Sequence, residues 1–218
     1  NGATTSAVSN VAAGNYTVTA TDANGCTIIR SVSVTEPAVL AVSYSQTNVS
    51  CNGGSNGSVS LSVTGGTSPY SYAWSNGAQT TAISGLIAGN YTVTVTDTNG
   101  CTTNVSATIT EPTALAATTN TTAVLCNGGS TGSMSVSVSG GTAAYSYSWS
   151  NGATASAVSN VSAGNYSVTA TDANGCTIIR SVSVTEPTAL AATTNTTAVL
   201  CNGGSTGSMS VSVSGDRK

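Results

Sequence analysis

The sequence predicts an all-β protein made of tandem, small, antiparallel β-sandwich repeats of 75 residues. The tripeptide Asn-Gly-Cys ends at Cys26, Cys101 and Cys176, so that successive copies lie 75 residues apart. Between these landmarks, apolar residues alternate with serine and threonine, which is the pattern of strands with one buried and one solvated face. Turn signals recur about every 8–12 residues, a spacing that is typical of a sandwich.

The landmarks divide the 218 residues into just under three copies of the repeat. The expected parts are the C-terminal half of a repeat, two complete repeats, the N-terminal half of a repeat and a non-repeat tail: 1–37, 38–112, 113–187, 188–215 and 216–218. Cuts at 52–126 and 127–201 fit the same spacing, so the structural phase is open. Because the chain starts and stops in mid-repeat, we expect it to be a window onto a longer array.

The first half of the 38–112 copy contains two expected strands. Residues 40–51 place alternate apolar residues on one face, and these are Leu40, Val42 and Tyr44. Residues 52–57, Asn-Gly-Gly-Ser-Asn-Gly, have the composition of a turn. Residues 58–64 then alternate strictly, with valine and leucine inward and serine outward.

Two further strands precede the repeat's last hairpin. Residues 70–75 carry three aromatic side chains on one face, namely Tyr70, Tyr72 and Trp74. A sandwich buries a tryptophan in this way. Residues 80–86 form a shorter strand around Ile83 and Leu86.

The most distinctive element is the hairpin at 89–112, which recurs at 14–37 and 164–187. Asn99-Gly100 supplies the positive φ angles that a two-residue loop requires. The hairpin therefore presents a cysteine at its tip in every copy. The core aromatic residues that we expect are Trp74, Trp149, Tyr91 and Tyr166.

The composition excludes several classes of partner. Charged residues make up 5% of the chain and the net charge is −3, so there is no basic patch for nucleic acid. No apolar run approaches the roughly 18 residues of a membrane span. Regular apolar positions in a chain so rich in hydroxyl groups indicate a folded, extracellular protein.

The sequence offers no catalytic group, cofactor site or metal site. Without histidine there is no Ser-His-Asp arrangement, and a cysteine nucleophile would lack a partner. The carboxylates recur singly, and Asp97 and Glu111 are expected at opposite ends of a hairpin arm. We therefore predict that the protein is not an enzyme.

Three features have a second interpretation as sites. Asp97 could bind calcium, but one carboxylate falls short of the six to eight oxygens that Ca²⁺ takes, and a hydrogen bond to its own turn is favoured. Tyr70, Tyr72 and Trp74 could stack against a sugar, although a packed core is favoured. A threonine row could suit ice or a crystalline surface, but β-propensity also explains it: Thr92, Thr94 and Thr96.

The six cysteines predict a disulfide framework, because a chain without histidine or a Cys-x-x-Cys motif does not resemble a zinc site. The favoured pairs are 25 residues apart: Cys26–Cys51, Cys101–Cys126 and Cys176–Cys201. The alternative pairs are 50 apart, Cys51–Cys101 and Cys126–Cys176, with Cys26 and Cys201 left for neighbouring repeats. A third possibility has no bonds.

The 25-residue pairing follows from a presumed turn at Glu111-Pro112. If the chain reverses there, Cys101 and Cys126 lie 11 residues before and 14 after the proline, in arms of nearly equal length. The sulfurs would then meet within the ~6 Å Cα spacing of a disulfide. In an ordinary sandwich, by contrast, Cys51 would lie at the opposite pole from Cys101.

The segments CNGGSNGSVSLSVTGGTSPYSYAWSNG (51–77) and AGNYTVTVTDTNGC (88–101), followed by Glu111-Pro112, resemble the SprB-type repeat of Bacteroidota cell-surface gliding adhesins. The resemblance covers the chain apart from its last three residues. It implies tandem immunoglobulin-like or PKD-like repeats in a long, secreted, cell-surface filament. It also implies export by the type IX system, adhesion and gliding motility.

Three functional hypotheses follow. The first is a structural and adhesive stalk of tandem repeats, in which neighbouring repeats of the chain are the partners. The second is a carbohydrate-binding array that recognises surface polysaccharide through exposed aromatic residues. The third is a self-assembling filament subunit, which binds other chains through the incomplete sandwiches at its two ends.

Overall fold

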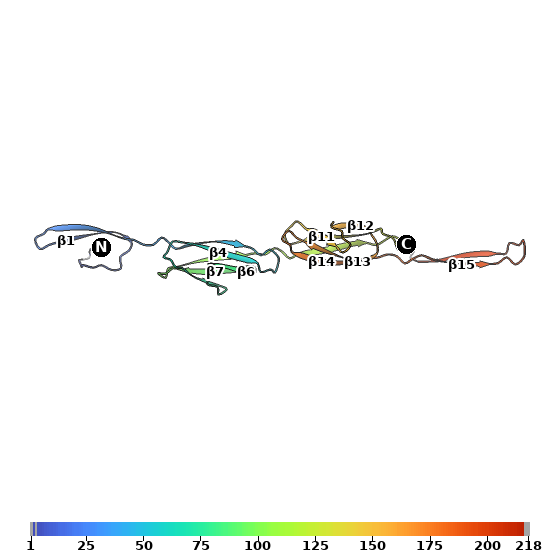
Figure 1. Cartoon of the computed structure of the whole chain (residues 1–218), viewed down its shortest axis with the longest axis horizontal. Helices are drawn as coiled ribbons and strands as arrows, with labels where there is room; N and C mark the ends of the chain where they lie inside the picture. Colours follow the sequence, from blue (N-terminus) through green and yellow to red (C-terminus); the bar gives the residue numbers. More distant parts are fainter. Residues whose placement is uncertain (1, 3, 216–218) are drawn as a thin grey trace. The chain divides into compact units, whose positions relative to one another are not determined.

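The computed structural model describes residues 2 and 4–215, and that part of the chain contains 16 strands and no helix (Figure 1). The expected tail at 216–218 lies outside the described residues, as do Asn1 and Ala3. The chain forms two compact units. Unit 1 comprises Asn1–Thr47, Ser58–Gly85 and Gly89–Ile109, and unit 2 comprises Asn48–Gly57, Leu86–Ala88 and Thr110–Lys218.

Unit 1 holds the strands of one sandwich. These are β3 (Ala41–Thr47), β4 (Gly57–Thr64), β5 (Ser71–Trp74), β6 (Ala82–Leu86), β7 (Gly89–Thr96) and β8 (Thr102–Ile109). They form two three-stranded sheets, ordered β3-β4-β6 and β5-β7-β8. The first, second and fourth strands thus share one sheet and the others share the second, which is the immunoglobulin-like division.

Strict alternation of side chains decides which residues form this core. Val93 and Val95 on β7 are buried, whereas the threonines between them face outward. Ala107 and Ile109 on β8 and Val59 on β4 are also buried. The inward positions expected from the sequence therefore form the interior.

Unit 2 repeats the arrangement. Its strands are β9 (Ala116–Thr122), β10 (Gly132–Ser139), β11 (Ser146–Trp149), β12 (Ala157–Val161), β13 (Gly164–Thr171) and β14 (Thr177–Val184). The sheets are ordered β12-β10-β9 and β11-β13-β14. Their core consists of Val124, Met134, Val136, Trp149, Val161, Val168, Val182 and Val184. The predicted all-β fold of small antiparallel, immunoglobulin-like sandwiches is confirmed.

Each unit also contains a separate two-stranded ladder. In unit 1, β1 (Gly14–Thr21) pairs with β2 (Thr27–Val34). In unit 2, β15 (Ala191–Thr197) pairs with β16 (Ser208–Ser214). No second sheet covers either ladder among the described residues, and their apolar side chains are largely exposed.

The first strand of the sandwich is shorter than the sequence predicts. The expected strand at 40–51 ends at Thr47, and Tyr44 is exposed. The chain leaves the sheet because Asn48 and Val49 bond to the end of β8 instead. The N–H of Val49 donates to the carbonyl oxygen of Thr110 (2.9 Å), and Asn48 Oδ1 accepts from the N–H of Thr110 (3.1 Å).

Gly140 follows β10 at a position that excludes any side chain. Its φ is +76°, and a Cβ there would lie 2.1 Å from the carbonyl oxygen of Ala114. We expect Gly140→Ala to destabilise the β9–β14 sandwich by at least about 2 kcal/mol in urea unfolding, because left-handed strain and steric overlap add. Gly152→Ala is the control, since Gly152 has φ +86° and nothing within 4 Å. Equal losses in the two variants would contradict the steric account.

Candidate functional site: a cysteine turn and a hairpin tip

The turn at Asn48–Gly57 is held to the Glu111-Pro112 dipeptide within unit 2. The N–H of Gly53 donates to Glu111 Oε2 at 2.7 Å. Asn52 Nδ2 donates to Glu111 Oε1 and to the carbonyl oxygen of Pro112, both at 3.1 Å. The carboxylate therefore fixes the turn at the end of the repeat, and Cys51 with it.

Cys51 forms a disulfide with Cys176, which lies at the tip of the β13–β14 hairpin. Their Cα atoms are 5.7 Å apart, and 125 residues separate them in sequence. Beside the bond, Asn174 Nδ2 donates to the carbonyl oxygen of Ser50 at 3.1 Å. The turn of one 75-residue copy is thus covalently joined to the hairpin tip of the next copy.

This bond differs from both pairings expected from the sequence. The 25-residue pairing, Cys26–Cys51, Cys101–Cys126 and Cys176–Cys201, requires the chain to fold back at Glu-Pro. It does not, because β14 belongs to the β11-β13-β14 sheet whereas β15 pairs with β16. The other four cysteines are free thiols, namely Cys26, Cys101, Cys126 and Cys201.

The 50-residue pairing, Cys51–Cys101 and Cys126–Cys176, is also absent. In unit 2 the N–H of Val124 donates to the carbonyl oxygen of Thr185 (2.8 Å), so the turn carrying Cys126 lies at the open end of the β13–β14 hairpin. Cys176 lies at the other end, beyond the Thr171–Thr177 pair. A strand of eight residues spans about 27 Å, far more than a disulfide can bridge.

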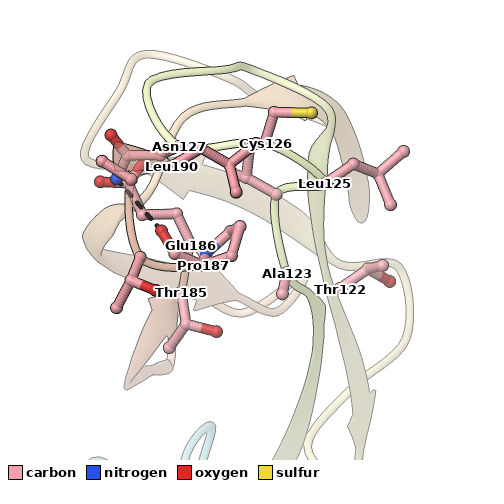
Figure 2. Close-up of a pocket in the computed structure, with 12 residues that line it drawn as sticks. Thr122, Ala123, Leu125, Cys126, Asn127, Thr185, Glu186, Pro187 and Leu190 are labelled. Carbon is pink, nitrogen blue, oxygen red and sulfur yellow. Dashed lines mark hydrogen bonds between the residues drawn. The ribbon is translucent and has the colours of Figure 1, made fainter. Parts of the chain in front are cut away.

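The second cysteine turn borders a pocket of about 700 Å³ instead of a bound hairpin tip. Figure 2 shows Asn127 directed toward Glu186 and Pro187, with the Cys126 thiol pointing away from them. Asn127 Nδ2 donates to the carbonyl oxygen of Pro187 at 3.1 Å, and the N–H of Gly128 donates to Glu186 Oε2 at 2.6 Å. The turn therefore has the same internal support as the turn of Cys51, with its thiol exposed.

Asp97 and Asp172 are buried carboxylates that fix the hairpin tips. Asp172 Oδ2 accepts from the N–H of Thr142 (2.8 Å), and its Oδ1 accepts from those of Asn174 (2.9 Å) and Cys176 (2.8 Å). Asp97 has the same set of backbone partners, listed here as Thr67, Asn99 and Cys101. These bonds are the turn interactions favoured over calcium, and no group of three metal-ligating side chains occurs within the described ranges.

The hydrogen bond from Thr142, opposed by burial and aided by those from Cys176 and Asn174, holds the pKa of Asp172 below its ordinary value of 3.8. The hydrogen bond from Thr67 is the main cause of the same downward shift in the pKa of Asp97. The negative charge on each carboxylate is therefore better stabilised in the folded chain than in the unfolded chain.

Asp172→Asn should flatten the acid dependence of the β9–β14 unfolding transition. A folded pKa below the unfolded one contributes stability that is present above about pH 4 and is lost as the pH falls through the folded value. The test is the urea midpoint measured between pH 7 and pH 2.5, with Asp22→Asn in the β1–β2 hairpin as the control. An unchanged slope in Asp172→Asn would contradict the assignment.

The aromatic side chains of the third strand face the interior. Trp74 is 5% exposed and Trp149 is 3% exposed. Their Nε1 atoms donate to the carbonyl oxygens of Thr80 (2.8 Å) and Ala155 (2.9 Å). Neither indole presents a face on which a sugar could stack.

The tyrosines are half-buried at the margin of the core. Tyr166 packs against the core of unit 2, and its hydroxyl donates to the carbonyl oxygen of Ser162 at 2.9 Å. Tyr91 occupies the same position in β7 and is also half-buried. Tyr70 donates to the carbonyl oxygen of Gly65 at 2.6 Å, and Tyr72 is half-buried.

The threonine row lies on the outer face of β7. Thr92 is exposed, and Thr94 and Thr96 are half-buried, so the row is uneven in its exposure. It lies in the central strand of the β5-β7-β8 sheet. Alternation about Val93 and Val95 accounts for its regular spacing.

The comparisons with known proteins agree on repeats. Residues 43–79 and 118–154 each match the family model described as SprB repeat. A search of curated proteins found no match. No helix in the part of the chain that the structure describes could cross a membrane.

Similar solved structures contain immunoglobulin domains. They include the N-terminal eight Ig domains of Down Syndrome Cell Adhesion Molecule isoform 1.30.30, with a TM-score of 0.44, 15% identity and coverage of 79% of this chain. The chain spans 28% of the length of that protein chain. The amphioxus IgVJ-C2 molecule has a TM-score of 0.28 and 15% identity, and the match covers 55% of this chain and 90% of that one.

Proposed function

We propose that this chain, which carries SprB repeats at 43–79 and 118–154, is a segment of an adhesive stalk on the outside of a bacterial cell. In this role the repeats are structural and not enzymatic. Tandem sandwiches supply length, and many weak contacts with a surface add through multivalency. Attachment to surfaces, surface polysaccharide as a ligand and a part in gliding belong to the proposal, as the family resemblance implies.

The Cys51–Cys176 bond is the observation that carries this proposal. A disulfide persists in oxidising surroundings, which supports a location outside the cytoplasm. Because it joins one copy of the repeat to the next, two covalent paths connect them, the disulfide and the main chain. Tension applied to the ends of the chain would bypass residues 52–175.

Pulling single molecules by their termini tests this mechanical role. We expect the oxidised chain to extend by roughly 410–450 Å less than the chain with Cys51→Ser, because the 125 residues closed by the bond are not stretched. Cys101→Ser, which removes a free thiol at the same repeat position as Cys176, is the control and should extend like the unaltered chain. Equal extension of the Cys51→Ser variant and the unaltered chain would contradict the proposal.

Labelling of intact cells tests the location. Antibodies raised against the 218-residue chain should label unpermeabilised cells that produce it, and brief protease treatment of those cells should remove the label. Labelling that requires permeabilisation would show that the protein is inside the cell and would overturn the adhesive role.

A further inference from the structure

Two ladders with exposed apolar faces have covered counterparts in unit 2. Residues 188–215, which contain β15–β16, are identical to 113–140, which contain β9–β10. Residues 14–37, which contain β1–β2, differ at a single position from 164–187, which contain β13–β14. The sandwich of unit 2 therefore shows how the two kinds of ladder fit together.

The exposed faces are those that become the core in this sandwich. Met209 on β16 is 88% exposed, whereas its counterpart Met134 is 1% exposed. Val18 on β1 is 57% exposed, whereas its counterpart Val168 is 1% exposed. Burying such side chains contributes about 1.5–3 kcal/mol each, so both faces gain from a partner.

Hydrogen bonds between the two halves of the sandwich also have counterparts in the ladders. The bonds run from Arg180 Nε to Ala117 O (3.0 Å), from Val124 N to Thr185 O (2.8 Å) and from Gly128 N to Glu186 Oε2 (2.6 Å). The corresponding pairs are Arg30 with Ala192, Val199 with Thr35, and Gly203 with Glu36. Every donor and acceptor of the template is present.

We infer that the chain binds a second copy of itself, with the β1–β2 hairpin of one copy covering the apolar face of β15–β16 in the other. This inference goes beyond the proposed adhesive role and does not depend on it. The occupant is specified by sequence, because the hairpin that covers β9–β10 is nearly the same as β1–β2. The low charge of the chain, with a net charge of −3, opposes the contact only weakly.

The free cysteines fit this arrangement. A turn cysteine bonds to the hairpin tip of the next repeat, as Cys51 does with Cys176. In the joined pair, the next tip after Cys126 of one copy is Cys26 of the other, and the next tip after Cys201 is Cys101 of the other. Each bond forms from two thiols with loss of two protons and two electrons, which reduce one oxidised glutathione to two reduced molecules.

The composite sandwich lacks one part of the template. Neither ladder contains a counterpart of 141–150, the segment with β11 and the buried Trp149. The contact is therefore weaker than the fold of an intact repeat. A peptide with the sequence Gly-Thr-Ala-Ala-Tyr-Ser-Tyr-Ser-Trp-Ser should fill the missing place and tighten the association.

Sedimentation of the whole chain under reducing conditions tests the contact. We expect assembly that increases with concentration and is enhanced by the peptide. Val18→Lys and Met209→Lys should raise the dissociation constant at least about tenfold, because the charge would be buried. Both side chains are exposed in the single chain, so the variants fold.

Two matched variants serve as controls. Ile29→Lys and Leu200→Lys alter side chains that are 61% and 82% exposed. Their counterparts in the complete sandwich, Ile179 and Leu125, are still 61% and 67% exposed. These controls should assemble normally. A chain that stays monomeric at all concentrations, or assembly that all four variants leave unchanged, would overturn the inference.

Peptide mapping after incubation with glutathione identifies the contact independently. The expected new bonds between copies are Cys126–Cys26 and Cys201–Cys101. Bonds between like cysteines, such as Cys26–Cys26, would contradict the arrangement. The same bonds in a species with the mass of one chain would show closure within a copy and would also overturn it.

Discussion

Replacement of Trp149 by alanine will lower the free energy of unfolding of the β9–β14 sandwich by about 3–5 kcal/mol. The indole is 3% exposed and lies in the core with Val136 and Val168. Its removal leaves a cavity, and the carbonyl oxygen of Ala155 loses the 2.9 Å hydrogen bond from Nε1. The loss is large because the sandwich is small and its core contains a single tryptophan.

Urea unfolding followed by far-ultraviolet circular dichroism measures this loss. Ile179→Ala is a suitable control, since that side chain is 61% exposed and its removal should cost less than about 0.5 kcal/mol. A loss below about 1 kcal/mol for Trp149→Ala would contradict the central place of the indole and would favour an accessible ring.

Cys176→Ser will lower the stability of unit 2 by about 2–4 kcal/mol under oxidising conditions. The bond to Cys51 closes a loop of 125 residues, and such a cross-link restricts the unfolded chain. It also fixes the tip of the β13–β14 hairpin against Ser50, whose carbonyl oxygen accepts from Asn174 (3.1 Å). The measurement is the urea midpoint of unit 2 with and without a reducing agent.

The chain contains its own control for this substitution. Cys101 occupies the same repeat position as Cys176 but is a free thiol, so Cys101→Ser should change the stability by less than about 0.5 kcal/mol. A reducing agent should lower the stability of the unaltered chain to that of Cys176→Ser. An effect of Cys101→Ser as large as that of Cys176→Ser would show that the bond is not the cause.

The hairpin at 89–112 illustrates what local sequence determines. The Asn99-Gly100 turn and the alternation of its arms predict two paired strands, and the structure pairs them from Gly89–Ile109 to Thr96–Thr102. Trp74 similarly lies inside, as the single aromatic face of its strand indicates. In both cases the decisive interactions occur within a few residues or across one hairpin.

The cysteine connection was not predictable in this way because it depends on how one repeat follows another. Equal chain lengths about Glu111-Pro112 suggested a hairpin, but β8 and β9 belong to different sheets. Glu111 instead accepts a hydrogen bond from the N–H of Gly53, a partner 58 residues away. The available signal was the fixed alternation of turn and tip cysteines, which permits a bond across 125 residues as well as across 25 or 50.

Non-reducing peptide mapping of the monomeric chain tests most directly whether consecutive repeats are joined from turn to tip. The account predicts one linked peptide pair, which contains Cys51 and Cys176, together with four cysteines that react with alkylating agents before reduction. Recovery of Cys51 linked to Cys26 or to Cys101 would contradict it, because the bond would then lie at another place in the repeat.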